Sequence, residues 1–325
     1  MTNTEDREDR RMNKEKVKKS KQALKLAARM SKQYYDKPLI IAYSGGKDSS
    51  VMLDLAERFL QPEDYEVMYN HTSADAPQTV QFIRAKFSQL SVKGVNCTDY
   101  IPRYKDGAQI TMWNLIPKKR MPPTRIVRYC CQKLKETSTP NRMCAVGVRK
   151  SESTGRMGRD IFSIIGKTKN LGQYYSLEHA KEVYQESNEI DDPNWDCNLI
   201  SNMKQNKNVV VNPIYEWSDR DIWEYITEYG LKINPLYYPP YNYKRVGCIG
   251  CPMATLEIVK KEFSDFPQYK QAYIKAFDRM IKERKKAGLI TKWDNGNEVY
   301  HWWINDDHIP GQMKFDDDLN IVKEE

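Results

Sequence analysis

A run of small, hydroxylated and charged residues near the start of the chain carries the groups that bind phosphate. The run reads Ser44-Gly-Gly-Lys-Asp-Ser49. Its two glycines let backbone N–H groups approach an anion without a Cβ in the way. The serine hydroxyls add donors, Lys47 adds a positive charge, and Asp48 offers a carboxylate to Mg²⁺. We therefore predict that a phosphate-bearing ligand contacts the following residues: Ser44, Gly45, Gly46, Lys47, Asp48 and Ser49.

The residues on either side of this run predict a strand before it and a helix after it. Leu39 to Tyr43 is a short apolar run with the length of a buried strand, and Asp48 opens a helix with apolar positions on one face. A helix N-terminus attracts anions because its first N–H groups are unpaired and its dipole is positive there. The spacing of a Walker loop is absent. An ordinary glycine turn is the alternative, and the full string at a strand-to-helix junction favours phosphate binding.

A second group of charged residues follows another apolar segment, Met143 to Val148. Arg149, Glu152 and Arg156 come directly after it. Guanidinium groups can bind phosphate or sulfate through two parallel hydrogen bonds, and Glu152 can orient Arg149 or bind a metal. A surface salt-bridge cluster is the alternative. Because parallel strands end at one edge of a sheet, we expect Arg149 and Arg156 to face the same cleft as the phosphate-binding run.

Four of the seven cysteines form two close pairs. Cys130 and Cys131 are adjacent, whereas Cys248 and Cys251 enclose a glycine in a Cys-x-x-Cys knuckle. Such a knuckle directs two thiolates at one metal, and two further ligands would complete a tetrahedral or cluster site. The side chains of adjacent cysteines diverge, which suits an iron–sulfur cluster better than one zinc ion. Zinc, a three-cysteine site, a redox pair and no metal at all are the alternatives.

These motifs resemble those of known enzymes. The run from Ser44 to Ser49 looks like the PP-loop of the ATP pyrophosphatase superfamily, whose members cleave ATP between the α and β phosphates. The block Gly147-Val-Arg149-x-x-Glu152-Ser-x-x-Arg156 resembles one in the phosphoadenosine phosphosulfate (PAPS) reductase family. The segment from Pro213 to Trp223 is similar to that family too. In the same family a segment Asp-Thr-Gly-x-x-x-Pro-Glu-Thr follows the second strand, and residues 71–79 match it in part.

Two details of the resemblance concern individual residues. His71 replaces the family's first aspartate, and Asp75 is placed to supply the missing carboxylate. The Cys-Cys pair followed by Cys-x-x-Cys resembles the [4Fe-4S] pattern of adenylyl-sulfate reductases. The resemblance covers residues 35–255 and identifies the chain as a member of the PP-loop, PAPS reductase-like family, which includes the DNA-phosphorothioation sulfurtransferases.

The resemblance implies an α/β fold of the adenine nucleotide alpha-hydrolase type. Its sheet is doubly wound and mostly parallel, with five strands and the nucleotide at the switch point. The apolar runs that we assign to these strands are 39–43, 65–69, 95–100, 143–148 and 209–214.

Composition suggests how the chain is divided. Residues 1–13 are polar and predict a disordered tail, residues 14–252 form the nucleotide-binding domain, and residues 253–325 form a helical C-terminal extension. We expect helices over residues 254–263 and 267–287. The polar segment 165–208 predicts an insertion or a mobile loop.

The charge and hydropathy of the chain limit its partners. No run of 18 apolar residues and no secretion signal is present, which predicts a cytoplasmic protein without a membrane partner. The net charge is +8, and residues 118–135 hold seven lysines and arginines with no acid. This basic segment suits a nucleotide, a sulfate or a nucleic acid, and a solvated basic face is the alternative.

One departure from the family bears on the reaction. Sulfonucleotide reductases use a catalytic cysteine in a C-terminal Glu-Cys-Gly-x-His segment, which this sequence lacks after Cys251. The resemblance therefore implies an ATP pyrophosphatase in sulfur transfer that acts on a nucleic acid or a small acceptor, with Lys47, Asp48 and Arg149 as catalytic residues. It also implies ATP, Mg²⁺ and a [4Fe-4S] cluster (zinc as the alternative), with a cysteine desulfurase as a possible sulfur donor. A PAPS or adenylyl-sulfate reductase is the second hypothesis, and a non-catalytic nucleotide sensor or DNA-bound subunit is the third.

Overall fold

The computed structural model describes residues 2–136, 138–139, 141–152, 156–157, 159–165, 173–182, 208–305, 314–315 and 321–322. The chain divides into two compact units. The first comprises Met1–Gln109 and Cys131–Gly247, and the second comprises Ile110–Cys130 and Cys248–Glu325.

This division differs from the predicted one because Ile110–Cys130 packs with the C-terminal helices. Its helix α4 (Met112–Lys119) lies against α10 (Pro267–Lys286). The sequence drew attention to the basic residues of this segment. Its packing is instead determined by an apolar face of Met112, Leu115 and Ile116, which is buried.

The first unit is built on a sheet of seven strands among the described residues, in the order β3-β2-β1-β4-β7-β5-β6. All five predicted strands form, and they pair in parallel. Two further strands, β5 and β6, were not predicted; β5 pairs antiparallel with both β7 and β6. The bounds are β1 Leu39–Ala42, β2 Tyr65–Asn70, β3 Asn96–Tyr100, β4 Met143–Ala145, β5 Phe162–Ile165, β6 Gln173–Tyr175 and β7 Asn208–Val211.

The polar segment 165–208 is therefore structured at its near end. Its first residue, Ile165, is the last residue of β5, and β6 lies inside the segment. Residues 166–172 and 183–207 of this predicted insertion lie outside the described residues, as does Cys197.

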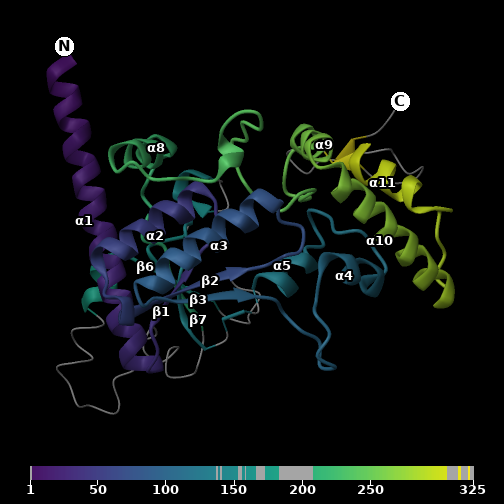
Figure 1. Cartoon of the computed structure of the whole chain (residues 1–325), viewed down its shortest axis with the longest axis horizontal. Helices are drawn as coiled ribbons and strands as arrows, with labels where there is room; N and C mark the ends of the chain where they lie inside the picture. Colours follow the sequence, from purple (N-terminus) through teal and green to yellow (C-terminus); the bar gives the residue numbers. More distant parts are fainter. Residues whose placement is uncertain are drawn as a thin grey trace. The chain divides into compact units, whose positions relative to one another are not determined.

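Helices connect and cover the strands. In Figure 1, α2 (Lys47–Phe59) and α3 (Pro77–Val92) run over the same side of the sheet. Strands β1, β2 and β3 lie next to one another in chain order, so the chain makes two successive crossovers toward the same edge of the sheet. Because both crossovers are right-handed, their helices must cover the same face. The chain reaches β4 on the other side of β1. The switch point therefore lies between β1 and β4, where the loops after both strands open.

The N-terminal helix α1 (Thr2–Tyr35) packs on α2 and on strands β1, β4 and β7. Its buried face includes Leu24, Ala27 and Met30, none of which is exposed to solvent. Burying each large apolar side chain contributes about 1.5–3 kcal/mol. The helix runs through the segment predicted as a disordered tail, because residues 1–13 contain no proline or glycine that would end it.

The second unit is helical around an aromatic centre. Both predicted helices form, as α9 (Leu256–Asp265) and α10, and α11 (Gly296–Asn305) joins them; a short pair, β8 (Lys314–Phe315) and β9 (Ile321–Val322), follows. Tyr273 of α10 is fully buried, and the rings of Trp303 and Phe263 lie 4.8 and 5.7 Å from its ring. Along the described part of the chain, no helix is both long and apolar enough to cross a bilayer.

Candidate active site at the sheet switch point

The loop after β1 is shaped by its own serines. Ser49 Oγ donates to the Gly46 carbonyl at 2.9 Å and accepts the Ser44 backbone N–H at 3.3 Å. Ser44 Oγ lies 3.1 Å from the same Ser49 oxygen. Gly45 has a φ of +71°, and a Cβ there would approach Ile83 to 3.0 Å. The loop is thus prearranged, and its N-cap residue, Gly46, has no side chain to cap the first turn of α2.

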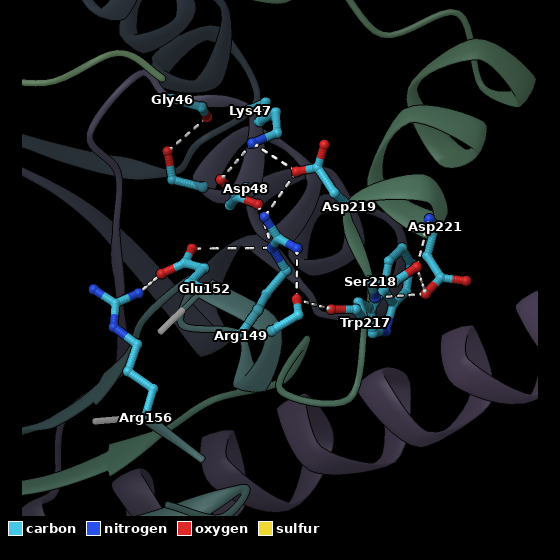
Figure 2. Close-up of polar contacts among 12 residues, drawn as sticks. Gly46, Lys47, Asp48, Arg149, Glu152, Arg156, Trp217, Ser218, Asp219 and Asp221 are labelled. Carbon is cyan, nitrogen blue, oxygen red and sulfur yellow. Dashed lines mark hydrogen bonds and ion pairs between the residues drawn. The ribbon is translucent and has the colours of Figure 1, made fainter. Parts of the chain in front are cut away.

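Four side chains form a closed ring of alternating charge beside this turn, which we call the charge ring (Figure 2). Lys47 Nζ lies 3.0 Å from Asp219 Oδ1 and 3.5 Å from Asp48 Oδ2. Arg149 completes the ring, with Nε 2.6 Å from Asp48 Oδ1 and Nη2 3.0 Å from Asp219 Oδ1. The ring joins groups that follow three adjacent strands, β1, β4 and β7. Two of its cations and one of its carboxylates are the residues predicted to be catalytic.

A glycine allows the β4 loop to approach α2. A Cβ on Gly147 would lie 3.2 Å from the backbone carbon of Asp48 and 3.2 Å from the backbone nitrogen of Ser49. Two residues later, Arg149 is buried and reaches the charge ring. The absence of a side chain at position 147 therefore sets how closely the guanidinium approaches the helix N-terminus.

Arg156 is linked to the charge ring through Glu152. Glu152 pairs with Arg156, and its other oxygen lies 3.9 Å from Arg149 Nε. Burial lowers the pKa of Arg156, and so do the nearby charges of Arg245 and Arg159. Positive charge is thus concentrated around Arg156. The structure brings Arg149 into contact with Asp48 of the phosphate loop, whereas Arg156 pairs with Glu152 and lies close enough to Asp48 for that charge to raise its pKa.

Asp219 was not predicted from the sequence. Helix α8 (Asp219–Glu228) begins with Ser218 as its N-cap and Asp221 at its third position. Asp219, the first helical residue, faces the charge ring instead (Figure 2). Burial raises its pKa, but the hydrogen bond and charge of Lys47 and the charge of Arg149 outweigh burial, so the pKa lies below its usual value. The sequence feature that could have identified Asp219 is an acidic residue in the first turn of the helix that follows β7.

Helix α1 braces the start of α8. Lys16 Nζ lies 2.6 Å from Asp221 Oδ2. The Ser20 hydroxyl donates to the Pro213 carbonyl at 2.7 Å and accepts the Trp217 indole N–H at 3.1 Å. These contacts hold the turn from which Asp219 projects.

Asp75 is held by hydrogen bonds from neighbouring residues of its own loop and strand. It is buried, and its Oδ2 accepts hydrogen bonds from the Tyr69 hydroxyl at 2.7 Å and from the backbone and hydroxyl of Thr72, both at 2.8 Å. This oxygen therefore fixes the loop after β2. Contact between Asp75 and a nucleotide stays a prediction.

A segment after α8, residues 234–241, is tied to the phosphate loop, and we call it the strap. The Asn234 amide donates to the Gly45 carbonyl at 3.3 Å and to the Thr79 hydroxyl at 2.9 Å. The Tyr237 hydroxyl, in the short helix η4 (Pro235–Tyr237), accepts the Lys47 backbone N–H at 2.9 Å. Sequence reasoning missed both residues, since about 190 positions separate them from the loop that they contact.

The predicted cysteine ligands fall into two groups. Cys130, Cys248 and Cys251 belong to the second unit, and all three thiols lie close enough to Tyr273 for their charges to raise its pKa, after the larger effect of burial. Cys131 is the next residue of α5 (Tyr129–Leu134). Among the described residues, no three His, Cys, Asp or Glu side chains are arranged to hold one metal ion. The sulfur donors suit iron or zinc chemically, and binding of one metal centre by all four cysteines stays a prediction.

The knuckle itself is held firmly inside the second unit. Glu262 Oε2 accepts the Gly250 N–H at 2.7 Å, and the Tyr273 hydroxyl donates to the Ile249 carbonyl at 3.0 Å. Burial raises the pKa of Glu262 to about 7, although the Gly250 hydrogen bond lowers it. Gly250 has a φ of +70°, and a Cβ there would lie 2.7 Å from the Phe263 ring.

Two curated proteins are similar to part of this chain. An uncharacterized protein of Methanocaldococcus jannaschii is 23% identical over 230 residues, 70% of this chain and 39% of that protein. Sulfate adenylyltransferase subunit 2 of Maricaulis maris is 25% identical over 224 residues, 64% of this chain and 62% of that protein. The chain thus spans less than two thirds of either curated relative.

A solved structure and a protein-family model are also similar to this chain. The phosphoadenylyl-sulfate reductase of Candida auris superposes with a TM-score of 0.38 at 15% identity, covering 65% of this chain and 81% of that one. The model of the phosphoadenosine phosphosulfate reductase domain matches residues 38–254, which include every strand from β1 to β7. The chain therefore belongs to the phosphoadenosine phosphosulfate reductase domain family.

Proposed function

We propose that this chain is an ATP pyrophosphatase that activates an acceptor for sulfur transfer. The observation that carries the proposal is the charge ring at the N-terminus of α2, in which Lys47 and Arg149 are held by Asp48 and Asp219. Two fixed cations beside a helix N-terminus suit a polyphosphate. One relative is named as a subunit of a sulfate adenylyltransferase, and transfer of an adenylyl group from ATP is the class of reaction proposed here.

The reaction has two steps. An oxygen of the acceptor attacks the α phosphorus of ATP, and the bond from that phosphorus to the bridging oxygen breaks, so pyrophosphate leaves with the electron pair. In the second step a persulfide sulfur from a donor attacks the activated centre of the acceptor, and AMP leaves with the electron pair of the broken bond; two thiols of a reductant then cleave the S–S bond to the donor and become a disulfide, which leaves the sulfur on the acceptor and the donor as a thiol. In the first step Lys47, Arg149 and the loop N–H groups would bind and orient the phosphates and stabilise the negative charge on pyrophosphate.

The carboxylates of the ring fit Mg²⁺. Asp48 and Asp219 both contact Arg149, so their oxygens lie close together, and Mg²⁺ is usually held by one or two carboxylates with substrate phosphates. Bound there, the ion would supply neutralisation of the phosphate charge. The two aspartates would hold it.

Cysteine-bound metal is a separate part of the proposal. We propose that Cys130, Cys131, Cys248 and Cys251 bind a [4Fe-4S] cluster, with zinc as the alternative. The gathering of three of these thiols near Tyr273 supports it. Anaerobically purified protein assayed for iron, sulfide and zinc tests it. Four iron atoms and four sulfides per chain are expected, and stoichiometric zinc or no metal would contradict the cluster.

The acceptor is proposed to be a nucleic acid. Supporting this, the described part of the second unit has a basic groove of about 510 Å³ between α4 and α10, lined in part by Lys118, Arg279, Lys282 and Lys286. Such a groove suits a phosphate backbone. A cysteine desulfurase is the proposed donor of the persulfide sulfur.

Turnover separates the three hypotheses for the chain. Labelled ATP and adenylated sulfate are supplied in parallel with Mg²⁺, reductant, and DNA or tRNA as acceptor. We expect AMP and pyrophosphate from ATP, and we expect the Asp48→Asn variant to lose turnover more than ATP affinity. Sulfite from adenylated sulfate, with no pyrophosphate from ATP, would identify a reductase. ATP binding without any product would identify a nucleotide sensor.

A further inference from the structure

The Tyr237 hydroxyl occupies a place that normally belongs to a ligand. It accepts the backbone N–H of Lys47, the first residue of α2. That N–H has no partner within the helix, and such groups are the ones that bind phosphate oxygens. A Cβ on Gly46 would lie 3.6 Å from the same hydroxyl, so the phenol lies directly against the phosphate loop.

The phenol ring is held in this position from several sides. It packs edge-on against Trp223 of α8, with ring centroids 5.8 Å apart and an interplanar angle of 89°. Asn234 fixes the start of the strap to Gly45 and Thr79, and its Oδ1 accepts the Leu236 N–H at 3.0 Å. At the far end, Gln78 of α3 donates to the Tyr241 hydroxyl at 2.8 Å. A strap anchored at both ends keeps the Tyr237 hydroxyl against the loop.

The hydroxyl keeps a proton that it can donate. Burial raises the pKa of Tyr237 to about 12, although the backbone hydrogen bond with Lys47 lowers it, so the phenol is neutral at pH 7. In the bond with Lys47 the oxygen is the acceptor. Its own O–H is therefore available to another acceptor, and a donated N–H makes that O–H a stronger donor.

We propose that Tyr237 is a binding residue for the β or γ phosphate of the nucleotide, and that its hydroxyl donates to a phosphate oxygen while it accepts the Lys47 N–H. The inference rests on the proposed function, because it assigns the phenol to the pyrophosphate part of ATP. Tyr237 then distinguishes ligands that carry this part from AMP, which lacks it.

Calorimetric titration of inorganic pyrophosphate and of AMP, each with Mg²⁺, tests the assignment. The proteins are the wild type, Tyr237→Phe and the matched control Tyr238→Phe, whose tyrosine is the next residue and is 48% exposed. Losing a hydrogen bond to a charged group weakens binding by about tenfold to a hundredfold. We expect that loss for pyrophosphate in Tyr237→Phe, with AMP affinity unchanged and Tyr238→Phe like the wild type.

Three outcomes would overturn the assignment. Unchanged pyrophosphate affinity in Tyr237→Phe would show that no phosphate bond is made, and tighter affinity would show that the hydroxyl competes with phosphate. Equal weakening of pyrophosphate and AMP would indicate a general effect on the fold, because a folding defect affects both ligands. If the wild type binds neither ATP nor pyrophosphate, the proposed function itself fails, and that result does not depend on any variant.

Discussion

The two candidate sites hold a carboxylate in opposite ways: the Asp219 side chain is 62% exposed, whereas Glu262 is buried. In the charge ring, Lys47 and Arg149 outweigh burial and keep the pKa of Asp219 below its usual value. In the second unit, Glu262 has one N–H from Gly250 and aromatic neighbours, and burial raises its pKa to about 7. The first arrangement keeps charges ready for a charged ligand. The second positions a loop through a carboxyl group that is easily neutralised.

Removing Arg149 should have the largest effect on this contrast. In Arg149→Ala, Asp48 and Asp219 lose the cation that bridges them, and ATP turnover should fall by about 10²–10³-fold, the range for loss of one charge-stabilising donor. Arg149→Lys keeps the charge but not the two-sided geometry, so it should be intermediate. Pyrophosphate release measures both. If Arg149→Ala turned over ATP at the wild-type rate, the arginine would have only a structural role as a salt-bridge partner.

An alanine at Gly250 tests how tightly the second unit holds its knuckle. The left-handed φ costs roughly 1–2 kcal/mol for a residue with a Cβ, and overpacking against Phe263 adds about 1–3 kcal/mol. We expect the free energy of unfolding to fall by about 2–5 kcal/mol in urea titrations. Gly247→Ala is the matched control: it lies three residues earlier, and a Cβ there meets nothing within 4 Å. Equal stability of the two variants would refute the packing argument.

The smallest expected effect is a pH dependence of stability. Glu262 has a pKa of about 7 in the folded protein against 4.5 when unfolded, so the folded state binds the extra proton between these values. Stability should therefore fall as pH rises from 4.5 to 7, by at most about 3 kcal/mol. Glu262→Gln keeps an acceptor for the Gly250 N–H and should remove the slope. Tyr273, which faces Glu262, is neutral in this range because its pKa is raised.

The pH dependence of stability that Asp219 contributes has the opposite sign. Its folded pKa is lowered, so its stabilising effect is present above the unfolded value of 3.8 and is lost as pH falls further. Thermal melts across pH 3–8 should therefore resemble the wild type at the acid end and depart from it in opposite directions at the high-pH end, with Asp219→Asn less stable and Glu262→Gln more stable. A common pH profile for both variants would contradict the contrast.

The central sheet was predictable because buried parallel strands are apolar along their whole length. Leu39–Ala42 and the three valines of β7 show this, and the phosphate loop was predictable from the glycines after β1. Strands β5 and β6 were not predicted, since they are short and border a polar segment. The packing of Ile110–Cys130 was hidden by its basic residues, which drew attention away from the apolar face of α4.

At the site, sequence reasoning found residues that belong to local motifs and missed those that arrive from elsewhere. Lys47, Asp48 and Arg149 stand at the ends of recognisable strands, and the structure brings them together. Asp219 was overlooked because capping explained its neighbours Ser218 and Asp221. Tyr237 could not be placed, because its contact depends on how the strap crosses back to α2. Spacing in the sequence carries no record of such a contact.

The brace from α1 has a consequence for where this protein can be cut. The family match begins at residue 38, after α1 has ended, yet Lys16 and Ser20 hold the turn that presents Asp219. A fragment starting at residue 38 would keep every recognisable motif and lose the support behind one side of the charge ring. It would also expose the apolar surface of the first unit against which Leu24 and Met30 pack. The part of the first unit that matches the family model is therefore smaller than the unit that packs as one body, because that unit includes α1.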